Sequence, residues 1–186
     1  MATGPSPPAV ARFLRPSIRT GFVAGVLLLV CGGAAWLTGL PALFPSLGPT
    51  AYVLVERPGA PESRSRRVLG GHTIGVVAGL VCYWVVAGSG TLTAPPPSGS
   101  LAGLRLAAAG VASVGLTSVG MLATDLRHAP ACATTLIVSL GLLSTLRRGV
   151  LVIAAVAVLV AAHHAGRLLI TRVHPEDLSL GPSRRS

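Results

Sequence analysis

The chain has 186 residues, of which 51% are hydrophobic and only 11% are charged. Soluble domains are about a quarter charged, so this composition, with a mean hydropathy of +0.72, excludes a soluble globular protein and indicates an integral membrane protein. The net charge of +10 does not indicate nucleic-acid binding, because the arginines flank apolar segments, as membrane topology requires, and aromatic side chains for base stacking are scarce.

Residues 1–19 contain four prolines and three arginines without an apolar period, which predicts a disordered cytoplasmic N-terminus. Residues 20–55 then contain no Asp, Glu, Arg or His. One membrane span needs only about 20 residues, so this segment holds two elements. A full helix is predicted over 20–40, followed after two helix-breaking prolines by a short element over 46–55.

The same order recurs further along the chain. A polar loop (56–67) leads to a full span (68–87), in which Gly71, Gly75 and Gly79 form a face of small residues typical of close helix packing. The remaining predicted elements are a loop at 88–100, a span at 101–124, a polar turn at 125–128, a short element at 129–143, a last span at 149–170 and a polar cytoplasmic tail at 171–186.

These elements predict an all-α, polytopic transmembrane bundle with four full spans and two short helices broken by Pro and Gly. The halves, about 20–87 and 101–170 of a transmembrane domain at 20–170, share the order long, short, Arg-Arg, long. If both short elements cross the membrane, the halves have opposite orientation and form a 3+3 inverted repeat. The alternative is four spans with two re-entrant segments.

Arginine counts favour six crossings. That topology places twelve arginines on the side of the two termini and three on the other, whereas a re-entrant second short element divides them ten to five. Arginine accumulates on the cytoplasmic side of membrane proteins. We therefore expect a multi-pass protein of the cell (inner) membrane with both termini in the cytoplasm.

Several ordered motifs resemble the HPP family of small integral membrane proteins. They are Phe-Pro-Ser-Leu-Gly-Pro-Thr-Ala at 44–51, Arg-Arg at 66–67, Gly-Gly-His at 70–72 and His-Ala-Pro-Ala-Cys-Ala-Thr-Thr at 128–135. This chain has Ala129 where the family name implies Pro, and Cys132 where the family usually has Gly. Some members in photosynthetic organisms are associated with nitrite transport, so the resemblance implies a membrane protein that carries a small solute.

The residues of the two short elements suggest a site. A helix N-terminus attracts anions through its unpaired N–H groups, hydroxyls add donors, and a membrane histidine is a candidate proton carrier. The predicted substrate-binding or translocation residues are Ser46, Gly48, Thr50, His72, His128, Pro130, Thr134 and Thr135. The alternative is structural: the hydroxyls cap helix starts and the imidazoles bond to carbonyls.

Other polar groups carry weaker signals. His163, His164 and Arg167 either line a polar path or lie beneath the cytoplasmic interface. The three cysteines have no metal-ligand spacing, so no metal and no cofactor are expected.

The sequence thus predicts a transporter or channel-like permease for a small solute, with nitrite or another small anion as the candidate substrate. The alternative is a non-transporting membrane scaffold or assembly protein. Because no hydrolase motif is present, an enzyme is not expected. The expected partners are the lipid bilayer and a small anion, without nucleic acid, and a homo-oligomer is left open.

Overall fold

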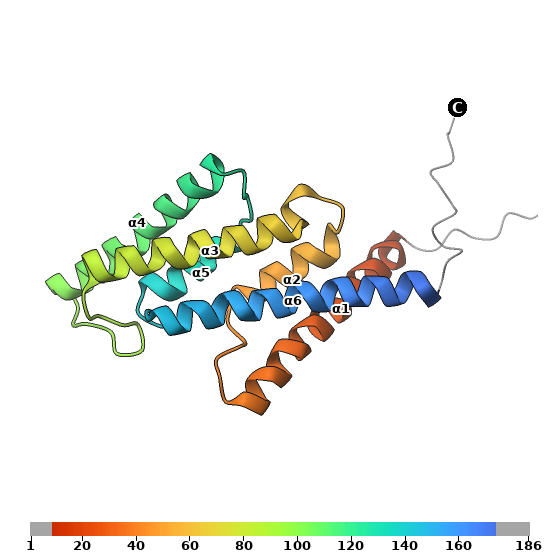
Figure 1. Cartoon of the computed structure of the whole chain (residues 1–186), viewed down its shortest axis with the longest axis horizontal. Helices are drawn as coiled ribbons and strands as arrows, with labels where there is room; N and C mark the ends of the chain where they lie inside the picture. The colour runs from red at the N-terminus through yellow and green to blue at the C-terminus, as the bar shows by residue number, and fades with distance from the viewer. Residues whose placement is uncertain (1–8, 174–186) are drawn as a thin grey trace, which may run out of the picture.

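In the computed structural model, residues 9–173 are described, and within them the regular structure is entirely helical, without a β-strand (Figure 1). The elements in chain order are α1 (Ala9–Thr38), α2 (Leu47–Glu56), the 3₁₀ turn η1 (Pro61–Ser63), α3 (Ser65–Cys82), the π-helical turn η2 (Tyr83–Ala87), α4 (Leu101–Ala123), α5 (Ala131–Ser139) and α6 (Leu146–Val173).

Four of these helices are long and apolar enough to cross a membrane. The segments are Pro16–Thr38, Ser65–Ala87, Leu101–Ala123 and Leu146–Leu169. In contrast, α2 has ten residues and α5 has nine, which at 1.5 Å per residue is about half the thickness of the hydrocarbon core. The predicted bundle of four full spans and two short helices is therefore confirmed.

Three helices begin earlier than predicted. Helix α1 begins at Ala9, so residues 9–19 are helical and not disordered, while residues 1–8 lie outside the described part. Pro16 removes only one backbone bond in α1, and the Ala, Arg and Leu residues before it favour helix. Likewise α3 begins at Ser65 and α6 at Leu146, so both Arg-Arg pairs belong to first helical turns.

Contacts between distant segments define one end of the bundle, which we call the Asp125 end. There the hydroxyl of Thr20 in α1 donates to the Glu56 carboxylate at the end of α2, over 3.0 Å. The end of α6 approaches the start of α3, since His164 Nε2 lies 3.4 Å from Ser65 Oγ. In addition, an ion pair joins the start of α3 to Asp125 after α4. Within residues 9–173, the chain next to the four segments that the arginine count assigns to one side thus lies together.

The opposite end contains the loop 88–100. The N–H of Leu92 donates to the carbonyl of Leu140 just after α5, over 3.1 Å, and the Thr91 hydroxyl donates to the carbonyl of Gly141 over 3.3 Å. Helix α5 therefore runs from the Asp125 end to a loop of the opposite end, as the six-crossing topology requires. The order long, short, long recurs in both halves, while their relation by an inverting axis stays a prediction.

The predicted glycine face of α3 packs against α5, and we call this contact the glycine seam. A Cβ on Gly71 would lie 3.0 Å from His128 Cβ, one on Gly75 would lie 2.8 Å from the Ala131 carbonyl oxygen, and one on Gly79 would lie 2.9 Å from the Thr135 carbonyl oxygen. The absence of side chains thus lets the two backbones approach closely. Figure 1 shows α5 lying alongside α3 inside the bundle.

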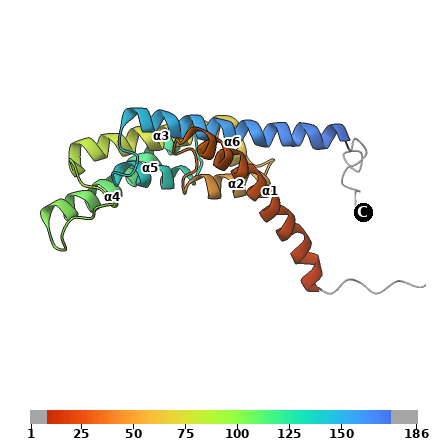
Figure 2. The same ribbon diagram turned by 90° about the horizontal axis from the view of Figure 1, so that it is seen from below.

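Helices α1, α2 and α6 share an apolar core with parts of α3 and α5. Its fully buried members include Leu47, Leu54, Val152, Val156 and Leu159. In Figure 2 the N-terminal half of α1 projects at an angle from the layer that the other helices form. Correspondingly, α1 is the least buried of the four spans.

We predict that Gly75→Ala lowers the free energy of unfolding by roughly 1–3 kcal/mol, because overpacked interiors must shift backbone to make room. The added methyl group meets the Ala131 carbonyl, which cannot rotate away. Gly115→Ala on α4 is the control, since nothing lies within 4 Å of the added atom. Thermal unfolding of both variants in detergent measures the effect, and equal melting temperatures would contradict the glycine seam.

Candidate functional site

Five polar side chains without exposed surface form one hydrogen-bonded group between the two short helices, which we call the hydroxyl–imidazole cluster. Its members are Ser46, Thr50, His72, His128 and Thr134. Ser46 precedes α2 and its Oγ lies 2.6 Å from Thr134 Oγ1 in α5. His72, from α3, lies between the short helices: its Nδ1 is 2.7 Å from Thr134 Oγ1 and its Nε2 is 3.0 Å from Thr50 Oγ1.

The two threonines that flank His72 occupy corresponding places in the two predicted halves. Thr50 is the fourth residue of α2 and Thr134 is the fourth of α5. Each short helix therefore presents a hydroxyl from its first turn to one nitrogen of the same imidazole. Ser46 and Thr50 have no exposed surface, so this side of the first turn of α2 faces the interior of the bundle, where Ser46 contacts Thr134 of α5.

His128 continues the cluster toward the Asp125 end. Its Nε2 lies 3.3 Å from Thr50 Oγ1, and its Nδ1 lies 3.0 Å from the carbonyl oxygen of Glu62 in η1. A carbonyl only accepts, so Nδ1 carries a proton and donates it to Glu62. The His128 ring centroid is 5.2 Å from that of His72. Burial lowers the pKa of His128, opposed by the Glu62 carbonyl and carboxylate, which favours the neutral imidazole.

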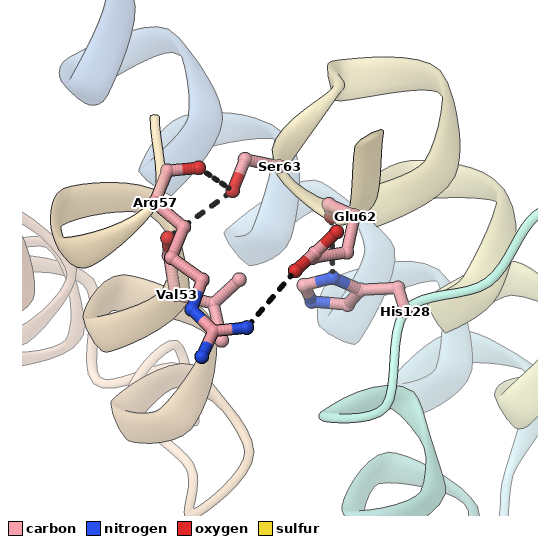
Figure 3. Close-up of polar contacts among 5 residues, drawn as sticks. All are labelled: Val53, Arg57, Glu62, Ser63 and His128. Carbon is pink, nitrogen blue, oxygen red and sulfur yellow. Dashed lines mark hydrogen bonds and ion pairs between the residues drawn. The ribbon is translucent and has the colours of Figure 1, made fainter. Parts of the chain in front are cut away.

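The loop that contains Glu62, the hydrogen-bond partner of His128, is itself hydrogen-bonded to the end of α2. The Ser63 hydroxyl lies 2.6 Å from the Arg57 carbonyl oxygen and 3.1 Å from that of Val53 (Figure 3). The guanidinium of Arg57 lies 3.6 Å from the Glu62 carboxylate. These contacts hold the Glu62 carbonyl in place, so the His128 bond ties the α4–α5 turn to the α2–α3 loop.

A second tie joins the same two segments. Arg67 Nη2 donates to Asp125 Oδ2 over 2.6 Å, and Arg127 lies 3.6 Å from the other oxygen of that carboxylate. The hydrogen bond from Arg67 holds the pKa of Asp125 below its ordinary value of 3.8, and the charges of Arg67, Arg127 and Arg66 act in the same direction. Asp125 has a φ of +53°, a conformation that Asp and Asn adopt more readily than most residues.

Three predicted site residues lie outside the cluster. Thr135 points to α4, where its Oγ1 is 2.6 Å from Thr117 Oγ1 and donates to the Gly75 carbonyl over 3.0 Å. Pro130 is the residue before α5, and its carbonyl accepts from the Ala133 N–H. Gly48 is half-buried, and a Cβ there would meet nothing within 4 Å.

A second group of buried hydroxyls was not predicted. Ser113 and Thr117, on one face of α4, contact α5: Ser113 Oγ lies 2.9 Å from Ser139 Oγ, and Thr117 contacts Thr135. All have no exposed surface. A signal was available, because Gly110, Ser113 and Thr117 recur at helical spacing in a span otherwise rich in Ala, Val and Leu.

The histidine pair of α6 is separate from the cluster. His163 and His164 form an edge-to-face ring contact with centroids 5.7 Å apart. His164 Nδ1 lies 2.8 Å from the Val160 carbonyl of its own helix, and its Nε2 approaches Ser65 at the Asp125 end. The pair thus lies at the Asp125 end, while its role, in a polar path or beneath a membrane interface, stays a prediction.

Neither the cavity nor the groove found in residues 9–173 is lined by the cluster. The cavity, of about 160 Å³, lies between α1 and α6 beside Cys31, and the groove lies between α3 and α4 beside Ile74. Within the described residues, no buried polar side-chain atom lacks a hydrogen-bond partner. At the start of α5, the N–H groups of residues 131–133 donate to carbonyls three residues earlier. The cluster is thus closed, and its donors are occupied.

No group of three or more His, Cys, Asp or Glu side chains gathers in the described residues in a way that suits a metal ion. The cluster contributes only two imidazoles, and hydroxyls occupy three of their four nitrogens while a carbonyl holds the fourth. Its chemistry is therefore the donation and acceptance of hydrogen bonds and protons.

Comparison with protein families gives one finding. The family described as the HPP transmembrane region matches residues 8–175, which includes both short helices and every residue of the cluster. Neither the curated proteins nor the solved structures contain a match.

We predict that Thr134→Val lowers the free energy of unfolding by about 1–3 kcal/mol, because a buried polar group without a partner retains its full desolvation penalty. The change removes the partner of Ser46 Oγ and of His72 Nδ1. Thr73→Val is the matched control, since the exposed Thr73 hydroxyl bonds only to the Leu69 carbonyl of its own helix. Thermal unfolding in detergent compares them, and equal losses would contradict the network.

We predict a pH-dependent effect of Asp125→Asn. Because Arg67 lowers the pKa of Asp125 from 3.8, the ion pair stabilises the fold above that value, and this contribution disappears as pH falls through the lowered pKa. Asn tolerates the positive φ and removes only the charge. The melting temperature of the wild type should therefore exceed that of the variant near neutral pH, and the difference should shrink in acid. A difference independent of pH would contradict the assignment.

Proposed function

The chain belongs to the HPP transmembrane region family, as its motifs predicted, and we propose from this premise that it is a transporter or channel-like permease for a small solute. That the chain is an integral, multi-pass membrane protein follows from its family and its four apolar helices. The proposal concerns what the protein carries, and through which residues.

The observation that supports transport is the hydroxyl–imidazole cluster. Polar and ionisable side chains inside a membrane protein are costly and characteristically mark pathways for ions or substrates. Here His72, Thr50 and Thr134 gather where two interrupted helices meet, with no exposed surface. Membrane transporters bind their substrates at such discontinuous helices.

The chemistry of the cluster favours a small anion. Hydroxyls and imidazole N–H groups donate hydrogen bonds, and an anion that accepts them gains more than a neutral solute does. Nitrite is the first substrate to test, because the family resemblance implies it and because it is small. In the closed arrangement the donors satisfy one another, so a bound anion would replace the Ser46–Thr134 contact.

The arginine distribution supports an orientation. Arg57, Arg64, Arg66, Arg67 and Arg127 all lie at the Asp125 end, and the positive-inside rule assigns such an end to the cytoplasm. We propose on this basis that the protein resides in the inner membrane with the Asp125 end cytoplasmic.

A second candidate function is a non-transporting membrane scaffold. Complete pairing of buried polar side chains within residues 9–173 favours it, because such a network also serves to specify a unique core. The predicted partner face of α3, however, is already occupied by α5 in the glycine seam. A partner helix or a second copy of the chain would therefore bind elsewhere.

We predict that the purified chain in liposomes takes up nitrite faster than protein-free liposomes. Thr50→Val and Thr134→Val should each reduce uptake by about tenfold or more, since a hydrogen bond to a charged group contributes about 1.5–3 kcal/mol. Thr50→Ser and Thr134→Ser should restore uptake because they keep the hydroxyl, and the control Thr73→Val should leave it unchanged.

Nitrite-sensitive indicators inside the liposomes measure these rates, with nitrate and formate as further anions. Folded wild-type protein that carries none of the three would contradict the transporter proposal and favour the scaffold. Equal uptake by the wild type and both valine variants would instead remove the cluster from the pathway.

A further inference from the structure

Five hydrogen-bonding contacts connect the members of the cluster in one series. In order they join Ser46 Oγ to Thr134 Oγ1, Thr134 Oγ1 to His72 Nδ1, His72 Nε2 to Thr50 Oγ1, Thr50 Oγ1 to His128 Nε2, and His128 Nδ1 to the Glu62 carbonyl. Every group before the terminal carbonyl both donates and accepts. Such alternation is the requirement for passing a proton along a chain, and a single non-amphoteric member would interrupt it.

The terminal carbonyl sets the direction of all five bonds. Because Nδ1 of a neutral His128 donates to Glu62, its Nε2 must accept, and Thr50 is the group placed to donate to it. Thr50 then accepts from His72 Nε2–H, so His72 Nδ1 accepts from Thr134 and Thr134 from Ser46. All donors thus point toward the Glu62 end without any charged member.

Thr50 is the point at which this chain connects or breaks. Its single hydroxyl hydrogen has two acceptors: the Ser46 carbonyl at 2.8 Å and His128 Nε2 at 3.3 Å. When the hydrogen points to Ser46, the chain is broken between Thr50 and His128. When it rotates to His128, the five bonds are continuous.

We propose that Ser46, Thr134, His72, Thr50 and His128 form a proton relay, gated by the rotation of the Thr50 hydroxyl, that delivers one proton at a time toward Glu62. If the proposed transport function holds, on which this step rests, the proton accompanies the solute bound at Ser46 and Thr134. The solute, or the water that accompanies it, supplies the proton at Ser46.

A proton added to Ser46 Oγ displaces the Ser46 hydrogen to Thr134, that of Thr134 to His72 Nδ1, and that of His72 Nε2 to Thr50. The Thr50 hydrogen then moves to His128 Nε2, which makes His128 an imidazolium. Release of its Nδ1 hydrogen to water at the Glu62 end restores a neutral chain in which the first four bonds are reversed. The bond from Nδ1 to the Glu62 carbonyl is lost until the hydrogens rotate back, because a carbonyl cannot donate. One proton has then been taken up and one given off.

Only one of the two imidazoles in the relay can be protonated to a cation at a time. Two imidazolium rings with centroids 5.2 Å apart would repel each other. From η1 the Glu62 carboxylate favours the proton on His128, whereas α2 and α5 contribute only uncharged hydroxyls. Asp125, Arg67 and Arg127 pair with one another beside the turn. The half-buried Glu62 therefore marks the side on which the proton leaves.

Exchange of the His72 ring proton with water tests the relay without transport. In the full chain in detergent, labelled with ¹⁵N-histidine, Thr50→Val should slow this exchange by about tenfold or more, because it removes the only link to His128. Thr134→Val is the matched control: it also deletes one hydrogen bond to His72, but on the side away from Glu62, where no solute is present in this experiment to exchange a proton with the buried Ser46. The His72 exchange in Thr134→Val should therefore stay faster than in Thr50→Val. Thr50→Ser should exchange like the wild type.

Proton uptake, measured with a pH-sensitive dye inside the same liposomes during nitrite uptake, tests the coupling. The coupling is supported if the wild type and Thr50→Ser take up a proton together with nitrite and Thr50→Val does not. Nitrite uptake without a proton overturns the coupling and leaves the transport function standing. Equal His72 exchange in Thr50→Val and Thr134→Val overturns the relay itself, whether or not any solute is carried.

Discussion

The close approach of α5 to α3 is the constraint on which the rest of the bundle depends. Side chains larger than hydrogen at Gly71, Gly75 or Gly79 would meet the backbone or β-carbons of α5 and the preceding turn. Because the backbones are so near, the ring centroids of His128 and His72 lie 5.2 Å apart. The Thr134 hydroxyl contacts Nδ1 of His72, whereas the Thr50 hydroxyl contacts Nε2 of the same ring. A wider spacing would move these groups beyond hydrogen-bonding distance. The buried polar atoms would then be unpaired, which costs free energy.

The same approach is part of a broad contact between the two halves of the chain, in which α3 packs against α4, α5 and α6, and α1 packs against α6. One half supplies Ser46, Thr50 and His72, and the other supplies His128 and Thr134. At the Asp125 end, the ion pair between Arg67 and Asp125 and the bond from His128 to Glu62 link the same halves again. The cluster is therefore a junction between halves and not a property of either one.

Much of this arrangement could be predicted from the sequence. The prolines after residue 40 and the missing charges identified a short element, and the glycine spacing identified the packed face of α3. Of the eight predicted site residues, those with hydroxyls or imidazoles all lie in buried networks. Yet sequence spacing could not reveal that adjacent Thr134 and Thr135 face different neighbours, since this depends on which helices flank α5. The contacts of the α4 hydroxyls could not be predicted, because a serine or threonine in a helix can equally bond to a carbonyl of its own helix, as Ser118 does.

The irregular connection between α1 and α2 has a consequence for the least buried span. Leu40 and Ala42 lie beside Leu151 and Ala154 of α6, several residues inside a membrane-spanning helix. Phe44 in the same connection belongs to the same buried apolar core as Cys31 of α1. Non-helical backbone at that depth must be solvated by protein, because acyl chains offer it no hydrogen bonds. Helix α1 is therefore a partial lipid barrier as well as an anchor. It lines one cavity together with Leu40 and Ala42, whereas Pro41, Leu43 and Pro45 of the connection remain exposed.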